Sequence, residues 1–136
     1  MTEKEILEKI QNYNYYVAVK TELEGQLESL VSKITAEYGE TAGGGGTFDS
    51  KVEKLAIKRE RVESKIKALD YSMQVVKDLI ENSGLEQTEK DVMWQVAKCE
   101  SLISYARNQK LYKSYVYKIK DRALKKISLK LQNVRK

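Results

Sequence analysis

Apolar residues recur every three or four positions along most of this chain, a spacing that gathers side chains on one face of an α-helix. The first run begins at Thr2, because Thr2 and Glu5 have the spacing of a capping box, and it continues to about Glu37. Its apolar positions are Ile6, Ile10, Tyr13, Val17, Leu23, Leu27, Leu30 and Ile34. The stripe changes phase near Lys20, which predicts a helix that turns its apolar face gradually or breaks slightly around Gly25.

A glycine-rich stretch separates this run from the next. Gly39 and the consecutive glycines 43–46 predict a connector over residues 39–47, because four glycines in a row lose too much backbone entropy to be held in a helix. A phosphate-cradling loop fits these glycines poorly, since no Gly-Lys-Ser/Thr follows them and residues 47–49 lack the required lysine.

A second long helix follows, capped by Asp49 or by Ser50 with Glu53 three residues later. Its apolar positions are Val52, Leu55, Val62, Ile66, Leu69, Met73, Val76 and Ile80. Apart from Arg59 this seam is unbroken over about four heptads, which predicts lengthwise packing against another helix. The first helix is the natural partner, giving an antiparallel hairpin over residues 1–82. Alternatively, the seam packs against the seam of a second copy of the chain. Hairpins that pair into dimers would use both kinds of packing, within one chain and between two.

Shorter helical segments follow the hairpin. Asn82-Ser83-Gly84 supplies a left-handed helix end, and Thr88 with Asp91 predicts the cap of a third helix. That helix includes Trp94, as a core or interface anchor, and the apolar residues Val92, Met93, Val96 and Ala97. The pattern therefore predicts an all-α protein, with a long antiparallel helical hairpin followed by a small C-terminal unit over residues 86–134.

The composition favours helices and excludes several kinds of chemistry. There is no proline, and 33% of the residues are charged, as in long solvated helices. There is no histidine and one cysteine, so an intramolecular disulfide, a zinc site and a His-based triad are excluded, and Cys99 is predicted to be small, buried and apolar. We therefore expect that the protein is not an enzyme and that it has no cofactor and no metal site. No apolar run has the length of a signal or membrane span, so we expect a cytoplasmic protein.

Positive charge is concentrated in the last third of the chain. From Lys98 to Lys136 there are twelve Lys or Arg residues against only Glu100 and Asp121, so this segment carries about +10, whereas residues 1–97 carry about −5. Clustered positive charge of this density is stable when it is solvated or when it faces a polyanion. The segment therefore points to nucleic acid, with a solvated lysine-rich helix as the alternative.

The segment from Ser101 to Ile127 matches the apolar pattern of a helix-turn-helix. A small residue is needed where the two helices of this motif cross at a steep angle, and Ala106 holds that place. Leu111 supplies the hydrophobic residue that follows the turn. The buried positions of the second helix are Val116, Ile119, Ala123 and Ile127.

Three residues depart from the usual helix-turn-helix pattern. Lys110 stands where glycine is usual, so a left-handed backbone there costs about 1 kcal/mol, and Gln109 replaces an apolar residue. Tyr112 occupies the position of the capping Ser or Thr, which leaves Ser114 or a backbone arrangement to cap the second helix. A helical bundle with no groove-binding function is the alternative interpretation.

If the second helix of the motif enters a DNA major groove, the face opposite its buried stripe meets the bases. That face carries Lys113, Ser114, Tyr117, Lys118 and, at its edge, Asp121. The surrounding cations are predicted to touch phosphates, and they are Arg107, Lys110, Lys120, Arg122, Lys125 and Lys126. Tyr105 and Tyr115 are predicted to pack in the core, whereas Tyr117 is placed to contact a phosphate or a thymine methyl group.

The order of these parts resembles the small phage-encoded late-gene transcriptional regulators of the RinA and ArpU type. The most specific stretch covers Tyr115–Ile119 and Arg122–Leu124, within "KSYVYKIKDRALKKI", and it is similar to the last helix of sigma-factor region 4. The resemblance covers nearly the whole chain in layout and about 30 residues in motif. It implies a transcription activator acting on phage or prophage operons in a Gram-positive bacterium.

The sequence thus predicts a DNA-binding transcriptional regulator whose hairpin supplies oligomerisation or partner contacts. Its expected partners are double-stranded DNA, RNA polymerase and a second copy of the chain, with no membrane. One alternative is a viral packaging component such as a small terminase subunit, which also combines a helix-turn-helix with oligomerising helices. The other is a protein-interaction module that binds RNA polymerase or another regulator and uses its lysines only for solubility.

Overall fold

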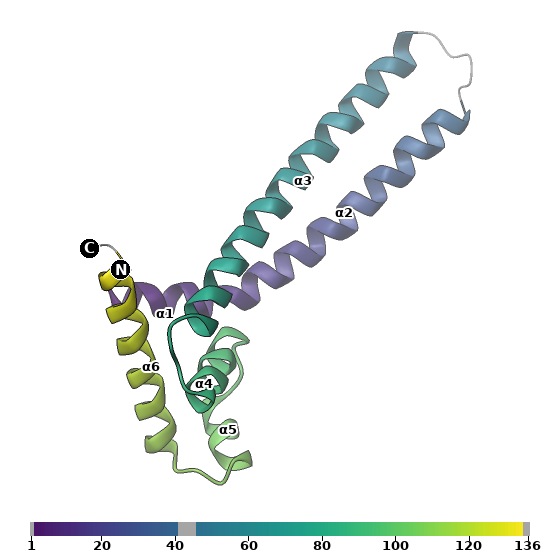
Figure 1. The fold of residues 1–136 in the computed structure, drawn as a ribbon. Helices are drawn as coiled ribbons and strands as arrows, with labels where there is room; N and C mark the ends of the chain where they lie inside the picture. The colour runs from purple at the N-terminus through teal and green to yellow at the C-terminus, as the bar shows by residue number, and fades with distance from the viewer. Residues whose placement is uncertain (1, 41–45, 135–136) are drawn as a thin grey trace. The chain divides into compact units, whose positions relative to one another are not determined.

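The computed structural model describes residues 2–40 and 46–134, and these ranges form six helices and no strand (Figure 1). The helices are α1 (Glu3–Gln11), α2 (Tyr13–Glu40), α3 (Gly46–Glu81), α4 (Gln87–Ala97), α5 (Leu102–Asn108) and α6 (Lys113–Val134). The predicted all-α class is confirmed, with a long antiparallel hairpin followed by smaller C-terminal helices.

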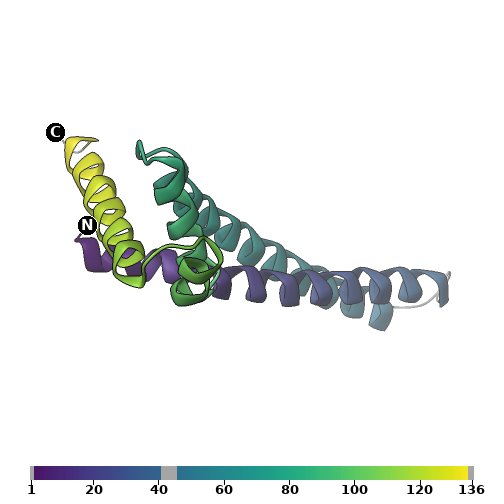
Figure 2. The same ribbon diagram turned by 90° about the horizontal axis from the view of Figure 1, so that it is seen from below.

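Packing divides the chain into two compact units. One unit comprises the residues up to Tyr16 together with those from Ser72 onward, and the other, the hairpin unit, comprises residues 17–71. The sequence-based boundaries assign α1 to the same part as the hairpin. In the structure α1 instead packs against α4 and α6, and Figure 2 shows α1 beside α6 from a second direction.

In the hairpin unit, α2 and α3 run antiparallel, as Figure 1 shows. The Nζ of Lys20 on α2 lies 2.6 Å from a carboxylate oxygen of Asp70 on α3, which fixes the register at this end. The hydrogen bond to Asp70 raises the pKa of Lys20. Ile66 and Leu69 of the predicted seam are half-buried, and Val62 is buried with 9% of its surface exposed.

The other unit has a continuous apolar core built from four helices. Helix α1 contributes Ile6 and Ile10, which are fully buried, and α3 contributes its last turns. The core residues are Ile6, Ile10, Val76, Leu79, Ile80, Leu85, Met93, Ala97, Ala123, Leu124 and Ile127. Burial of side chains this size stabilises a fold by about 1.5 to 3 kcal/mol each, so this core anchors α6 firmly.

For the first helical run the sequence predicted either a gradual turn of the apolar face or a slight break around Gly25, and the structure has a break at another position. The α-helical pattern is interrupted at Asn12, between α1 and α2, whereas Gly25 lies inside an unbroken α2. Asn is a weak helix former because its side chain competes for backbone hydrogen bonds. A glycine that faces open space, as Gly25 does, lowers helix stability without forcing a bend. The capping prediction at Thr2 is confirmed, since its hydroxyl accepts from the Glu5 N–H at 3.2 Å.

The predicted connector over residues 39–47 is shorter in the structure. Helix α2 extends to Glu40 and α3 begins at Gly46, three residues before the predicted cap at Asp49. Residues 41–45 lie outside the described residues. A helix that is packed along most of its length can propagate into weak formers at its end, because each added residue gains a hydrogen bond after nucleation is complete.

The structure confirms the predicted end of α3 and shifts the predicted start of α4. Gly84 adopts a left-handed backbone with φ of 73°, as predicted for the close of α3. Helix α4 begins two residues earlier than predicted, with Glu86 in place of Thr88 as its cap. The Glu86 N–H donates to Oε1 of Glu89 at 2.9 Å, so the box is closed by the residue three positions after Glu86.

Within the residues that the structure describes, none of the helices is both long and apolar enough to span a membrane.

We expect Leu69→Asp to lower the free energy of unfolding by about 1 to 3 kcal/mol, because a carboxylate would enter the seam between α2 and α3. Ile57→Asp is the matched control on α3, since Ile57 is 49% exposed, and it should cost under about 1 kcal/mol. Urea denaturation of the full chain measures both. Equal stability losses in the two variants would contradict the seam.

Candidate nucleic-acid interface

Helices α5 and α6 are joined by a tight turn and share a small core with α4. Val92 of α4, Ala106 of α5, and Val116 and Ile119 of α6 form the buried cluster. Leu102, Tyr105 and Leu111 pack against it. The buried positions predicted for the helix-turn-helix are therefore confirmed, and Ala106, 3% exposed, stands where the helices meet.

The turn between α5 and α6 adopts the left-handed backbone that its sequence disfavours. Lys110 has φ of 57°, the value at which glycine is usual. The Leu111 N–H donates to the Ala106 carbonyl at 2.8 Å, and the Lys110 N–H donates to the Arg107 carbonyl at 3.3 Å. These two bonds form a Schellman motif, which satisfies the last carbonyls of α5. The motif explains how the turn closes without glycine: Leu111 packs into the core and two hydrogen bonds offset the strain.

Helix α6 begins without a capping hydroxyl. It starts at Lys113, so Tyr112 precedes the first residue, and the Tyr112 side chain is 85% exposed. The backbone carbonyl of Tyr112 accepts hydrogen bonds from the N–H groups of Tyr115 and Val116 at 3.1 and 3.2 Å. Helix α5, in contrast, begins with a side-chain cap, because Ser101 Oγ accepts from the Ser104 N–H at 3.2 Å.

The outer face of α6 carries the residues predicted to read bases. Lys113, Ser114 and Lys118 are exposed, and Tyr117 is half-buried. The Nζ atoms of Lys113 and Lys120 lie 5.9 and 5.2 Å from the centre of the Tyr117 ring. The ring attracts both ammonium groups, which holds three of the site residues in one cluster at the start of the helix.

Of the six cations predicted to contact phosphates, Lys120 lies over the Tyr117 ring, and the other five fall into two groups. Arg107, Lys110 and Lys125 are exposed, and the described residues place no carboxylate at ion-pair distance from them. Arg122 and Lys126 instead reach Glu89 on α4: the Nε of Arg122 is 3.4 Å from Oε2, and the Nζ of Lys126 is 2.7 Å from Oε1. These two side chains hold α6 on α4 as well as facing outward.

Glu89 joins α4 to α6 beneath the candidate interface, and the sequence analysis missed it. It is fully buried, although it is charged, and it accepts from both Lys126 and the Glu86 N–H. Burial alone raises the pKa of Glu89. The hydrogen bonds from Lys126 and Glu86 and the charges of Lys126 and Arg122 outweigh burial, so the pKa lies below its ordinary value. One signal was available: position 89 falls on the same helical stripe as Val92 and Met93.

Four further side chains test predictions about single residues. Cys99 is exposed and has a left-handed backbone, φ of 56°, so the prediction that it is buried was wrong; it ends α4 in a second Schellman motif. Tyr105 packs on the small core as predicted, but Tyr115 is 46% exposed and does not. Trp94 is an anchor: its Nε1 donates to Glu81 at 2.8 Å, which lowers the Glu81 pKa.

The outer face of α6 and the cations around it offer a positively charged surface. No group of three or more Cys, Asp or Glu side chains in the described part of the chain is placed to hold a metal ion. Comparison with known proteins finds no matching family model, no matching curated protein and no matching solved structure.

We expect Glu89→Gln to destabilise the protein by about 1.5 to 3 kcal/mol at pH 7, because hydrogen bonds to a charged acceptor are lost. The folded-state pKa of Glu89 is depressed, so its contribution is present above the unfolded pKa, about 4.3, and is lost as the pH falls through the folded value. The gap between parent and variant should therefore close in acid. Urea titrations across pH 3 to 7 measure it, with the exposed Glu100→Gln as control. A gap that is independent of pH would exclude the ionic role.

We expect Lys110→Gly to raise the free energy of unfolding by about 1 kcal/mol, because glycine adopts positive φ without steric cost. Gln109→Gly is the matched control, since Gln109 has φ of −90° and glycine there only adds backbone entropy to the unfolded chain. Thermal denaturation compares the two variants. Should Lys110→Gly lower the melting temperature as Gln109→Gly does, the left-handed turn is not the conformation in solution.

Proposed function

We propose that this protein is a DNA-binding transcriptional regulator that places α6 in the major groove of duplex DNA. The observation that carries the proposal is the exposed face of α6: Lys113, Ser114 and Lys118 face solvent, while Val116 and Ile119 are buried. A rigid helix whose outer face is polar and cationic is suited to groove entry, and the surrounding positive charge favours phosphates.

The resemblance to the RinA and ArpU regulators supports a narrower form of this proposal. In that form the protein is encoded by a phage or prophage, acts in the cytoplasm of the bacterial host and activates late genes. RNA polymerase is then a further partner, because an activator must act on the transcribing enzyme.

A second candidate function draws support from the hairpin unit. Val31 and Ile57 are 38% and 49% exposed there, and the seam residues Ile66 and Leu69 are only half-buried. Apolar surface of this kind favours contact with another protein or another copy. A small terminase-like packaging component, or an interaction module for RNA polymerase or another regulator, would use the same surface. A ring of many copies in a mass measurement favours packaging, and no DNA affinity at low salt favours the interaction module.

The position of each residue along α6 separates the proposed base contacts from the proposed phosphate contacts. Lys113 and Tyr117 lie in its first turns, where a recognition helix meets base edges, whereas Lys125 lies two turns beyond Tyr117. A lost base contact costs about 1 to 3 kcal/mol at the specific site and little on random DNA. A lost phosphate contact weakens binding to all sequences and lowers the salt slope by about one.

We therefore expect Lys113→Ala and Tyr117→Ala to reduce specific binding more than nonspecific binding, and Lys125→Ala to reduce both alike. The operator is found first by mapping bound DNA across the host genome. Titrations on the operator and on random duplex at several salt concentrations then measure both affinities and their salt slopes. Equal losses on both duplexes for all three variants would show that α6 does not read bases, and a flat salt profile would remove the electrostatic basis of the proposal.

A further inference from the structure

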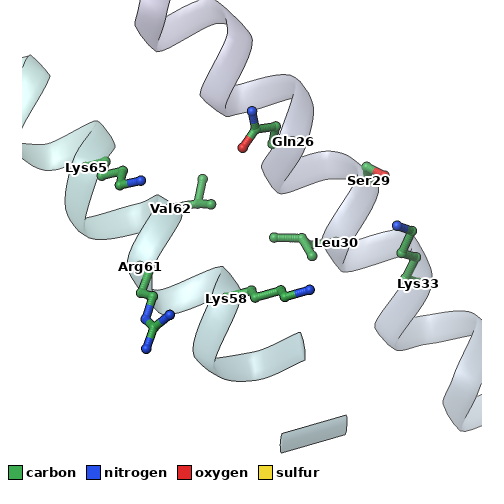
Figure 3. A pocket seen from close by; sticks show the side chains of 8 residues that line it. All are labelled: Gln26, Ser29, Leu30, Lys33, Lys58, Arg61, Val62 and Lys65. Carbon is green, nitrogen blue, oxygen red and sulfur yellow. The ribbon is translucent and has the colours of Figure 1, made fainter. Parts of the chain in front are cut away.

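The hairpin unit has a groove between α2 and α3 that is lined by cations. Lys33 of α2 and Lys58, Arg61 and Lys65 of α3 line it, and no acidic residue does. Figure 3 shows the apolar floor between the helices, where Leu30 and Val62 point toward one another, with the Lys58 and Lys65 side chains reaching from α3 toward α2. Its volume is about 350 Å³.

These four cations differ from others in the same hairpin. Lys20 is paired with Asp70 and Glu24, and Arg59 lies 2.9 Å from Glu63. None of the four groove cations has an ion-pair partner among the residues that the structure describes. Lys54 and Lys67 of α3 also have no ion-pair partner among the described residues, but at the groove four such cations lie together, which leaves a local excess of positive charge there. Such an excess is stable when it faces an anion.

The spacing of the groove cations suits a polymer of phosphates. Lys58 and Lys65 are seven residues apart on one helix face, which is about 10 Å along the axis. A DNA strand carries one phosphate for about each 3.4 Å of the duplex axis, so the two lysines span about three phosphates. The apolar floor accommodates the methylene stems of the lysines while their ammonium groups stay in water.

We propose that this groove, formed by Lys33, Lys58, Arg61 and Lys65, binds the phosphate backbone of nucleic acid. The inference extends the proposed function, because it adds a backbone-binding surface on the hairpin to the reading surface on α6, and it rests on duplex DNA being the ligand. The contact is independent of sequence, so it raises affinity for all DNA and steepens the dependence on salt.

Lysine acetylation of the full chain, with and without a long random duplex, tests the two surfaces separately. Mass spectrometry reads each lysine by itself. We expect DNA to protect Lys33, Lys58 and Lys65 from acetylation, and to leave the exposed Lys4 and Lys67 unchanged. Lys67 is the internal control, because it lies on α3 about half a turn away from the face that carries Lys58.

The pattern of protection distinguishes failure of this inference from failure of the proposed function. Protection of Lys113 and Lys118 without the groove lysines overturns the groove and leaves the α6 proposal standing. Protection of the groove lysines alone supports the groove and overturns α6. No protection by DNA overturns both. If polyglutamate or phosphatidylserine vesicles protect the groove lysines and DNA does not, the occupant is an acidic protein or a membrane, and the proposal is wrong.

A pair of charge-neutralising variants supplies the quantitative test. Lys58→Gln combined with Lys65→Gln should lower the slope of log affinity against log salt by about two, since each lost phosphate contact removes about one. Lys4→Gln combined with Lys67→Gln removes the same net charge and should leave the slope unchanged. Equal slopes in the two double variants would show that the groove lysines act only through net charge, which contradicts the proposed contact.

Discussion

The buried carboxylate of Glu89 is the interaction on which the candidate interface depends. It closes the first turn of α4 through the Glu86 N–H, and it holds Lys126 and Arg122 of α6. A buried charge is tolerated only when it is paired and hydrogen-bonded, so α4 and α6 must keep their relative positions for Glu89 to stay ionised. The exposed face of α6 is therefore fixed in orientation as well as in composition.

Two other features let α5 and α6 meet at close range. Ala106 leaves room at their crossing, and the Schellman motif at Lys110 reverses the chain in a few residues. The left-handed backbone at Lys110 is unfavourable for lysine, and the same conformation recurs at Cys99 at the end of α4. Both residues are exposed, and at each of them the two hydrogen bonds of a Schellman motif offset the strain.

The two units differ in how their positively charged side chains are paired with carboxylates. In the unit that contains α1 and α4 to α6, Glu89 neutralises part of the positive charge of α6, and Lys113, Lys118 and Lys125 remain exposed. In the hairpin unit, the Lys20–Asp70 ion pair joins the two helices, while the groove cations have no carboxylate at ion-pair distance among the described residues. Both arrangements leave cations on a rigid helical support. A support of this kind lowers the entropy that a cation loses on meeting a phosphate, which makes each contact more favourable.

The sequence by itself determined the features that depend on periodicity. Apolar spacing predicted the hairpin and the core positions Val116 and Ile119, because a helical stripe must be buried wherever it folds. The glycine at position 84 predicted the close of α3, because glycine adopts a left-handed backbone without steric cost. Tertiary structure alone decided which helices meet. It joined α1 to the C-terminal helices, moved the cap of α4 to Glu86, and brought Arg122 and Lys126 to Glu89. Spacing along a helix reports which side chains share a face, but an ion pair across 37 residues depends on how two faces pack together.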